Sequence, residues 1–242
     1  MTFHWNWRSN IGIERHENQD CAGIALGEDY LFAVIADGVF SRPRSGDLAR
    51  ALVTVLVDRA FGLRYQPDSS DVEQWVEDAY HRLRDVRAPR SAASFLAAVF
   101  SPQKLLFAVH AGDCRAGIQD KESRIEWKTP VHCLATALEP LSEEELRIHE
   151  ARNQLTRTFR TKGSCDPQVT ELGDEYSHGA ALVTDGFWAG LPTSMQSDFF
   201  CIDWMPDLNF DDDVSRLAIR WEEASPARTG CADNFYVRVR AV

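Results

Sequence analysis

Four aspartates in this 242-residue chain stand at the ends of apolar segments, each beside a glycine or an asparagine. They occur as Asp37-Gly38, Gly112-Asp113, Asp185-Gly186 and Asp233-Asn234. A short carboxylate at a strand end suits hard cations such as Mg²⁺, because an adjacent glycine lets carbonyl oxygens and waters approach the ion. One such pair alone is more often a turn signal. Four of them favour a metal site, and bound cations would let an acidic protein handle phosphate.

The segments beside these aspartates have the composition of buried strands. Short runs rich in apolar residues cover residues 30–36, 95–100, 105–111, 180–184 and 235–242. The second and third runs are separated by a four-residue turn, which predicts a β-hairpin that leads into Gly112-Asp113. The last run alternates apolar and polar residues, as a strand with one exposed face does.

Helical periodicity is clearest over residues 71–86, and further helices are expected over 46–61 and 213–224. Strands therefore cluster at the front and back of the chain, with a helix pair between them. This order favours an α+β fold of two packed antiparallel β-sheets flanked by helices, an α-β-β-α sandwich. A single domain spanning residues 1–242 is expected from the length.

The motifs occur in an order that resembles the type 2C metal-dependent protein phosphatases, the PPM class, and among them the bacterial-type single-domain members. The segments that carry the resemblance are GIERHENQD (12–20), ADGV (36–39), AGDCR (111–115), HEARNQLTR (149–157), TDGFW (184–188) and ADNF (232–235). They are spread over almost the whole chain. The resemblance implies the sandwich fold and a serine/threonine phosphoprotein phosphatase.

The resemblance also implies a central pair of Mn²⁺ or Mg²⁺ ions and assigns their ligands. Asp37 is expected to bridge both ions, and the carbonyl of Gly38 to complete the coordination of one. Asp185 and Asp233 are expected to bind the other ion. The two ions would activate a water molecule to attack the phosphomonoester.

Three more residues take roles by the same resemblance. Arg15 is expected to hold the substrate phosphate as a two-pronged donor, which suits the guanidinium. Asp20 is expected to act from behind the metals, through water or by fixing Arg15. Asp113 would form a third, weaker metal site with Asp185. In animal-type members a histidine follows the Asp-Gly pair, whereas Val39 stands here, which leaves protonation of the leaving group to water or another residue.

Composition bounds the remaining possibilities. The 37 acidic and 26 basic residues give a net charge of −11, which argues against binding to nucleic acid or to an anionic membrane. Six scattered cysteines form no CxxC pair, and no apolar run has the length of a membrane helix. We therefore expect a soluble cytoplasmic monomer whose partner is a kinase-modified phosphoprotein.

Two alternatives accompany this interpretation. A pseudophosphatase would keep the fold and bind phosphoproteins without turnover, although the presence of the core aspartates and Arg15 speaks against it. The acidic run Asp211-Asp212-Asp213 faintly resembles an aspartyl nucleophile motif of another phosphatase class, but it is interpreted as a cap at the start of the helix expected over 213–224.

Overall fold

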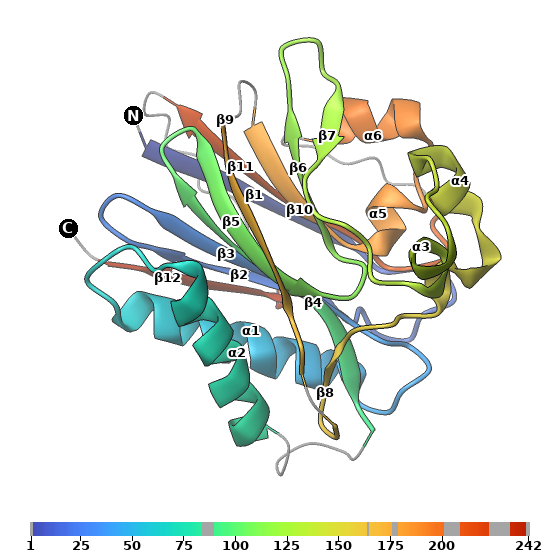
Figure 1. Cartoon of the computed structure of the whole chain (residues 1–242), viewed down its shortest axis with the longest axis horizontal. Coiled ribbons are helices and arrows are strands. Elements are labelled where there is room, and N and C mark those ends of the chain that lie inside the picture. The colour runs from blue at the N-terminus through green and yellow to red at the C-terminus, as the bar shows by residue number, and fades with distance from the viewer. Residues whose placement is uncertain are drawn as a thin grey trace.

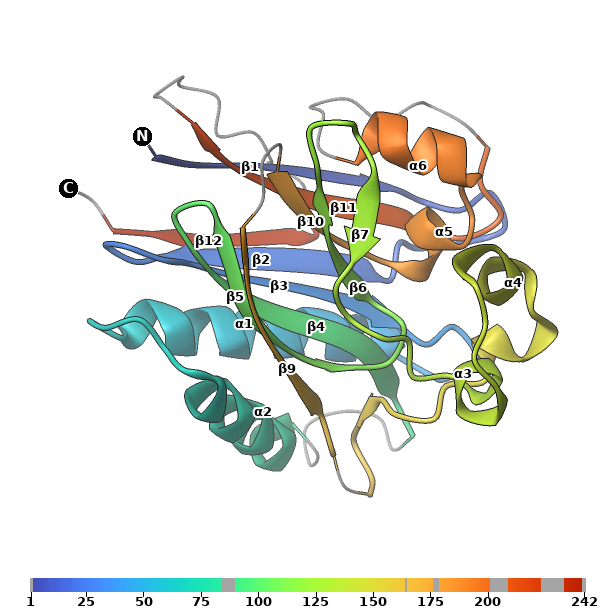
Figure 2. The same ribbon diagram turned by 45° about the horizontal axis from the view of Figure 1, so that its top comes forward.

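The computed structural model describes residues 2–83, 90–163, 165–175, 179–200, 209–222 and 233–240. In these ranges the strands form a five-stranded and a seven-stranded sheet. The two sheets pack face to face, and helices cover their outer faces (Figures 1 and 2). The predicted α-β-β-α sandwich is therefore confirmed.

The five-stranded sheet has the order β1-β11-β10-β6-β7. Its strands are β1 (Thr2–Asn10), β6 (Arg115–Gln119), β7 (Ile125–Trp127), β10 (Gly179–Val183) and β11 (Val214–Glu222). Every neighbouring pair in it is antiparallel.

The seven-stranded sheet has the order β12-β2-β3-β4-β5-β9, and β8 adds to the side of β4. Its strands are β2 (Asp20–Leu26), β3 (Leu31–Gly38), β4 (Ala92–Ser101), β5 (Lys104–Ala111), β8 (Phe159–Arg160), β9 (Gln168–Glu175) and β12 (Phe235–Val239). The predicted hairpin is β4–β5. The strand pairs of this sheet are antiparallel, except that β12 runs parallel to β2 at the edge.

Two long helices, α1 (Ser45–Gly62) and α2 (Ser69–Leu83), pack on the outer face of the seven-stranded sheet. They confirm the helices expected over 46–61 and 71–86, although residues 84–89 lie outside the described ranges. The shorter helices pack beside the other sheet. They are α3 (Leu134–Leu138), α4 (Glu143–Ile148), the 3₁₀ helix η1 (Glu150–Asn153), α5 (Asp185–Trp188) and α6 (Thr193–Phe199).

Strand β3 shows why the central strands are apolar on both faces. Phe32 and Val34 belong to the core under α1 and α2, whereas Ala33 and Ile35 belong to the core between the two sheets. Successive side chains of a strand point to opposite faces, so a strand covered on both sides needs a continuous apolar run. The run at residues 30–36 reflects this position.

The prediction of a helix over residues 213–224 is wrong. Val214–Glu222 is strand β11, paired along its length with β1; residues 223 and 224 lie outside the described ranges. Leu217 and Ile219 point into the core between the sheets. A short apolar run fits either kind of element, and the pairing with β1 decides in favour of the strand.

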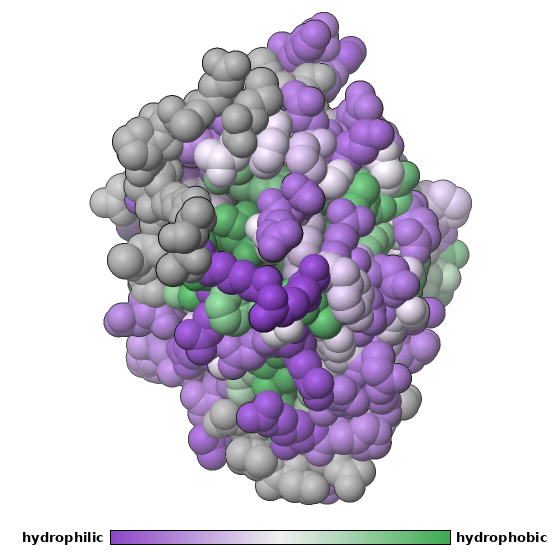
Figure 3. Space-filling view, turned by 90° about the vertical axis from the view of Figure 1, so that its left-hand side faces the viewer, coloured by the Kyte–Doolittle hydropathy of each residue, from purple (hydrophilic) through white to green (hydrophobic). Residues whose placement is uncertain are grey.

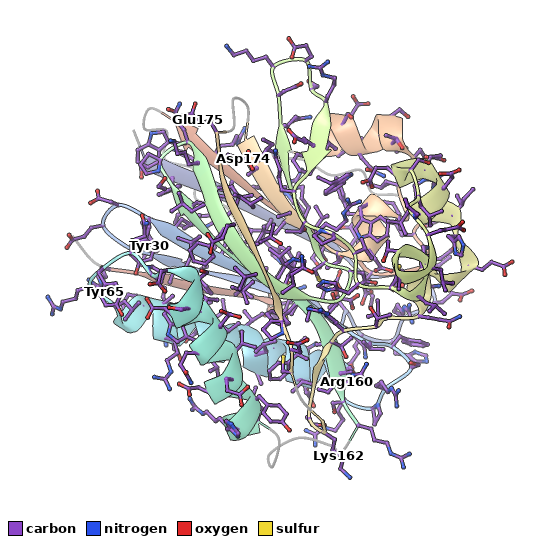
Figure 4. All side chains as sticks on the ribbon, viewed as in Figure 1. Tyr30, Tyr65, Arg160, Lys162, Asp174 and Glu175 are labelled. Carbon is purple, nitrogen blue, oxygen red and sulfur yellow. The ribbon has the colours of Figure 1, made fainter. Side chains whose placement is uncertain are left out.

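At the β2–β3 turn, the hydroxyl of Tyr30 donates to the carbonyl oxygen of Ala60 on α1 at 3.2 Å, which ties the turn to the helix (Figure 4).

The face seen in Figure 3 carries mostly polar side chains with smaller apolar areas between them, as a surface in contact with water does. Among the described helices, none combines the length and the apolar character needed to cross a membrane.

Candidate active site

A cavity of about 270 Å³ is lined by residues at or near the ends of several strands. Helices α3 and α5 lie on the same side of the sandwich as each other (Figure 2). Its lining is strongly acidic. The aspartates in the wall are Asp37, Asp113, Asp185, Asp212 and Asp213, and the cations are Arg15 and Arg152. Residues far apart in the sequence meet here because the strands that carry them end at one edge of the sandwich.

Asp37 and Gly38 close strand β3 and form one wall of this cavity. Asp37 lies directly opposite Asp20 in the β2–β3 pairing, and like charges in that position repel. A Cβ on Gly38 would lie only 2.6 Å from the backbone nitrogen of Gly46 and from the carbonyl carbon of Ser45. The first turn of α1 therefore packs on Gly38 more closely than any other residue would allow.

Asp20 is buried behind the cavity, with 1% of its surface exposed. Its Oδ2 accepts a hydrogen bond of 2.9 Å from the hydroxyl of Thr184, the residue before Asp185. Among the described contacts, Asp20 makes no bond to Arg15, and Thr184 directly follows β10. The alternative that Asp20 acts through water stays a prediction.

Asp212 is the residue that fixes Arg15. Both Nε and Nη2 of Arg15 donate to Oδ1 of Asp212, at 3.0 and 2.6 Å. The guanidinium carbon also lies 3.7 Å from the centre of the Phe40 ring, a cation–π contact. Arg15 is thus held at the rim of the cavity by one carboxylate and one aromatic face.

Asp213 has a different task from its neighbour. Its Oδ1 accepts from the backbone N–H of Gly12 at 2.9 Å, and its Oδ2 from the backbone N–H of Gln19 at 2.7 Å. Both oxygens therefore fasten the loop that carries Arg15. The expectation that this acidic run caps a helix is wrong, because a strand follows it. The sequence did contain a signal for these residues, because Asp212 and Asp213 directly adjoin an apolar run. Asp185 adjoins an apolar run in the same way.

Asp113 and Asp185 also line the cavity. The indole Nε1 of Trp188 donates to the carbonyl oxygen of Asp113 at 2.8 Å, which joins α5 to the β5–β6 turn. Arg152, on η1, donates from Nη1 to Oδ2 of Asp185 at 3.2 Å. The two aspartates that were expected to share a third metal site do line the same cavity.

Asp233, which was expected to bind an ion together with Asp185, does not line this cavity. It is exposed and lines a separate depression together with Asn18 and Arg50. Asp233 lies two residues before strand β12, which pairs with β2 at the edge of the sheet. Asp212 and Asp213, which directly precede β11, do line the cavity.

Burial raises the pKa of the site carboxyls, and their mutual repulsion adds to the effect. The carboxyls whose pKa is raised in this way are those of Asp20, Asp37, Asp113, Asp185 and Asp213. The pKa of Asp113 rises to about 7, through burial first and the charge of Asp185 second. A raised folded-state pKa means that folding stability is lost as the pH rises through it. The ionised cluster is therefore costly unless a cation offsets it.

The residues fit divalent cations chemically. Within the described ranges, the Oδ1 atoms of Asp20 and Asp113 are buried and have no hydrogen-bond partner, a costly state that a cation would relieve. In the same ranges, no three His, Cys, Asp or Glu side chains are placed to hold one ion as they stand. Mg²⁺ uses few carboxylates and keeps several waters, so an open acidic cavity can still accept it.

The fold is similar to that of solved bacterial phosphatases. A bacterial serine phosphatase matches with a TM-score of 0.74 and 16% identity, covering 93% of this chain and 100% of that one. The PPM Ser-Thr phosphatase MsPP from Mycobacterium smegmatis, solved with cacodylate, gives 0.71 and 20%, covering 90% and 98%. The catalytic domain of the phosphatase PstP, solved with two manganese ions, gives 0.64 and 15%, covering 90% and 97%.

No curated protein matches the chain. A family description does: Protein phosphatase 2C matches residues 14–217, a span that begins one residue before Arg15 and ends within β11. The match therefore includes Asp212 and Asp213 and leaves out Asp233. The chain belongs to the protein phosphatase 2C family.

Proposed function

We propose that the protein is a metal-dependent phosphatase that hydrolyses phosphoserine and phosphothreonine in proteins. One observation carries this proposal: five aspartates and Arg15 line a single cavity at the ends of the strands. Bound Mn²⁺ or Mg²⁺ would neutralise the carboxylates, and Arg15 would bind the phosphate.

The aspartates of the cavity would hold the ions between them. Asp37, with the carbonyl of Gly38, would hold the central pair of ions together with Asp185 and Asp212. Asp212 takes the place expected for Asp233, because it lines the cavity and holds Arg15. Asp113 would serve the third, weaker ion with Asp185. Two divalent cations held by these residues would supply a nucleophilic water near neutral pH and would offset charge on the phosphoryl oxygens.

Arg15 has the geometry of a phosphate anchor. Asp212 holds its guanidinium by two nitrogens on one carboxylate oxygen, and the Phe40 ring covers one face. A guanidinium fixed in this way loses little conformational freedom when it binds an anion. The exposed Phe40 lies at the rim, where the rest of the substrate would pass.

Metal dependence is the test of the proposed function. Hydrolysis of a chromogenic phosphate ester should require Mn²⁺ or Mg²⁺ and disappear in a chelator. Independently of activity, a hundredfold excess of Mn²⁺ over its dissociation constant should raise the melting temperature by about 5 to 10 °C. Full activity in the chelator would contradict the proposal. A shift in melting temperature without hydrolysis of any phosphoester would indicate the pseudophosphatase instead.

Arg15→Ala should lower kcat/KM at least about tenfold, because a hydrogen bond to a charged group contributes roughly 1.5 to 3 kcal/mol. Arg15→Lys should recover only part of the loss, since an ammonium cannot donate in the same fork. Mn²⁺ affinity, measured by calorimetry, should be retained in both variants. Unchanged kcat/KM in Arg15→Ala would remove this residue from phosphate binding.

A further inference from the structure

The turn that carries Asp113 has three successive backbone N–H groups, and each donates to a side chain. The N–H groups of Asp113 and Cys114 donate to the hydroxyl of Ser94, at 2.8 and 2.9 Å. The N–H of Gly112 donates to Nδ1 of His132, at 3.2 Å. In return, the backbone N–H of His132 donates to the carbonyl oxygen of Gly112, at 2.9 Å. The turn is therefore held from two sides.

The contacts of His132 determine which nitrogen of its ring carries the proton. Nε2 lies 2.9 Å from Oε1 of Gln168, and the ring stacks on His110 with centroids 4.8 Å apart and planes 10° from parallel. Because a carboxamide oxygen only accepts, Nε2 carries the proton and Nδ1 is free to accept from Gly112. Burial lowers the pKa of His132, which agrees with a neutral ring.

Only glycine fits at position 112 of this turn. Its φ is +115°, and a Cβ at this position would lie 2.3 Å from the Ser94 hydroxyl oxygen. Glycine permits this conformation but does not enforce it, since it has more backbone freedom than any other residue. The side-chain acceptors are what hold the turn in place.

We propose that His132 is a positioning residue that holds the Gly112-Asp113 turn so that the Asp113 carboxylate forms its part of the cavity wall. This inference rests on the proposed function and deepens it. The ring of His132 does not line the cavity, whereas Asp113 does. His132 would therefore act through Asp113, from the loop between β7 and α3.

Two substitutions of His132 by residues of nearly the same shape as each other test the hydrogen bond from the Gly112 N–H. His132→Asn places an oxygen where Nδ1 stands, while His132→Leu places a methyl group there, and both lose the stack on His110. With Leu, kcat should fall about tenfold, the effect expected when a buried N–H loses its acceptor, and the Mn²⁺ concentration for half-maximal turnover should rise. With Asn, kcat should stay within about threefold of the wild type. Equal behaviour of the two variants would overturn the proposal.

A double-mutant cycle with Asp113→Asn separates positioning from general destabilisation. If His132 acts through Asp113, the double variant His132→Leu/Asp113→Asn should be no slower than Asp113→Asn alone. Losses that multiply would mean that His132 supports the fold at large, and would overturn the proposal.

Calorimetric titration with Mn²⁺ keeps this test separate from the proposed function. His132→Leu should weaken the weakest Mn²⁺ site and leave the tight sites unchanged, and His132→Asn should not. A wild type that hydrolyses no phosphoester would refute the proposed function, but the titration would still decide the role of His132. Identical titrations for Leu, Asn and wild type would count against it.

Discussion

Asp37→Asn is expected to reduce phosphoester hydrolysis by at least about a hundredfold, because the metal ions it would bridge contribute several kcal/mol of transition-state stabilisation. The residue ends β3 inside the acidic cavity, opposite Asp20. The assay is a chromogenic phosphate ester at saturating Mn²⁺. Asp120→Asn, which changes a surface carboxylate paired with Arg124, is the matched control and should retain activity.

The stability of the same variant shows whether the loss is chemical. Burial and the charges of Asp20, Asp185, Asp113 and Asp212 raise the pKa of Asp37. Its ionised form therefore destabilises the metal-free fold above the ordinary carboxyl range, and a neutral asparagine removes that cost. Without metal, the Asp37→Asn variant should melt at or above the wild-type temperature. A drop of many degrees would attribute lost activity to misfolding, and retained activity would exclude Asp37 as the bridging ligand.

Asp212→Asn and Asp233→Asn form a pair with the same chemical change and opposite expected results. Asp212 lines the cavity and holds Arg15, so its neutralisation should weaken both metal and phosphate binding. We expect kcat/KM to fall at least about a hundredfold, the sum of two contributions of at least about 1.5 kcal/mol each. Asp233 is exposed in a separate depression, and its variant should stay within about twofold, as surface substitutions usually do.

Kinetics and Mn²⁺ titration of the two proteins at the same pH decide between them. The opposite order, with Asp233→Asn inactive and Asp212→Asn active, would show that the end of β12 reaches the metals in the working enzyme. It would also restore the ligand set expected from the order of motifs alone.

Local patterns were sufficient for much of the fold. The apolar runs before Asp37, Asp113 and Asp185 are strands, and both long helices lie where their periodicity places them. These features are readable because burial on one or two faces imposes a period on the residues themselves. The single domain, the monomeric state and the cytoplasmic location stay predictions.

The failures have one physical cause, which is pairing between distant segments. Residues 213–224 contain a short apolar run that suits a helix or a strand, and only the partner β1, about two hundred residues earlier in the chain, makes it β11. The position of Asp233 depends in the same way on the parallel pairing of β12 with β2. Neither pairing leaves a mark in the local sequence.

The sequence by itself predicted the sandwich and the aspartates at three strand ends, because residue type and periodicity encode burial locally. The role of Arg15 in phosphate binding came from the resemblance and stays a prediction. Only the tertiary structure decided which carboxylates share the cavity. In the structure Asp212 binds Arg15, 197 positions away in the sequence. Asp233 lines a separate depression, and His132 accepts a hydrogen bond from the turn that carries Asp113. Sheet order and register set these distances, and they arise from contacts summed over whole strands rather than from any motif.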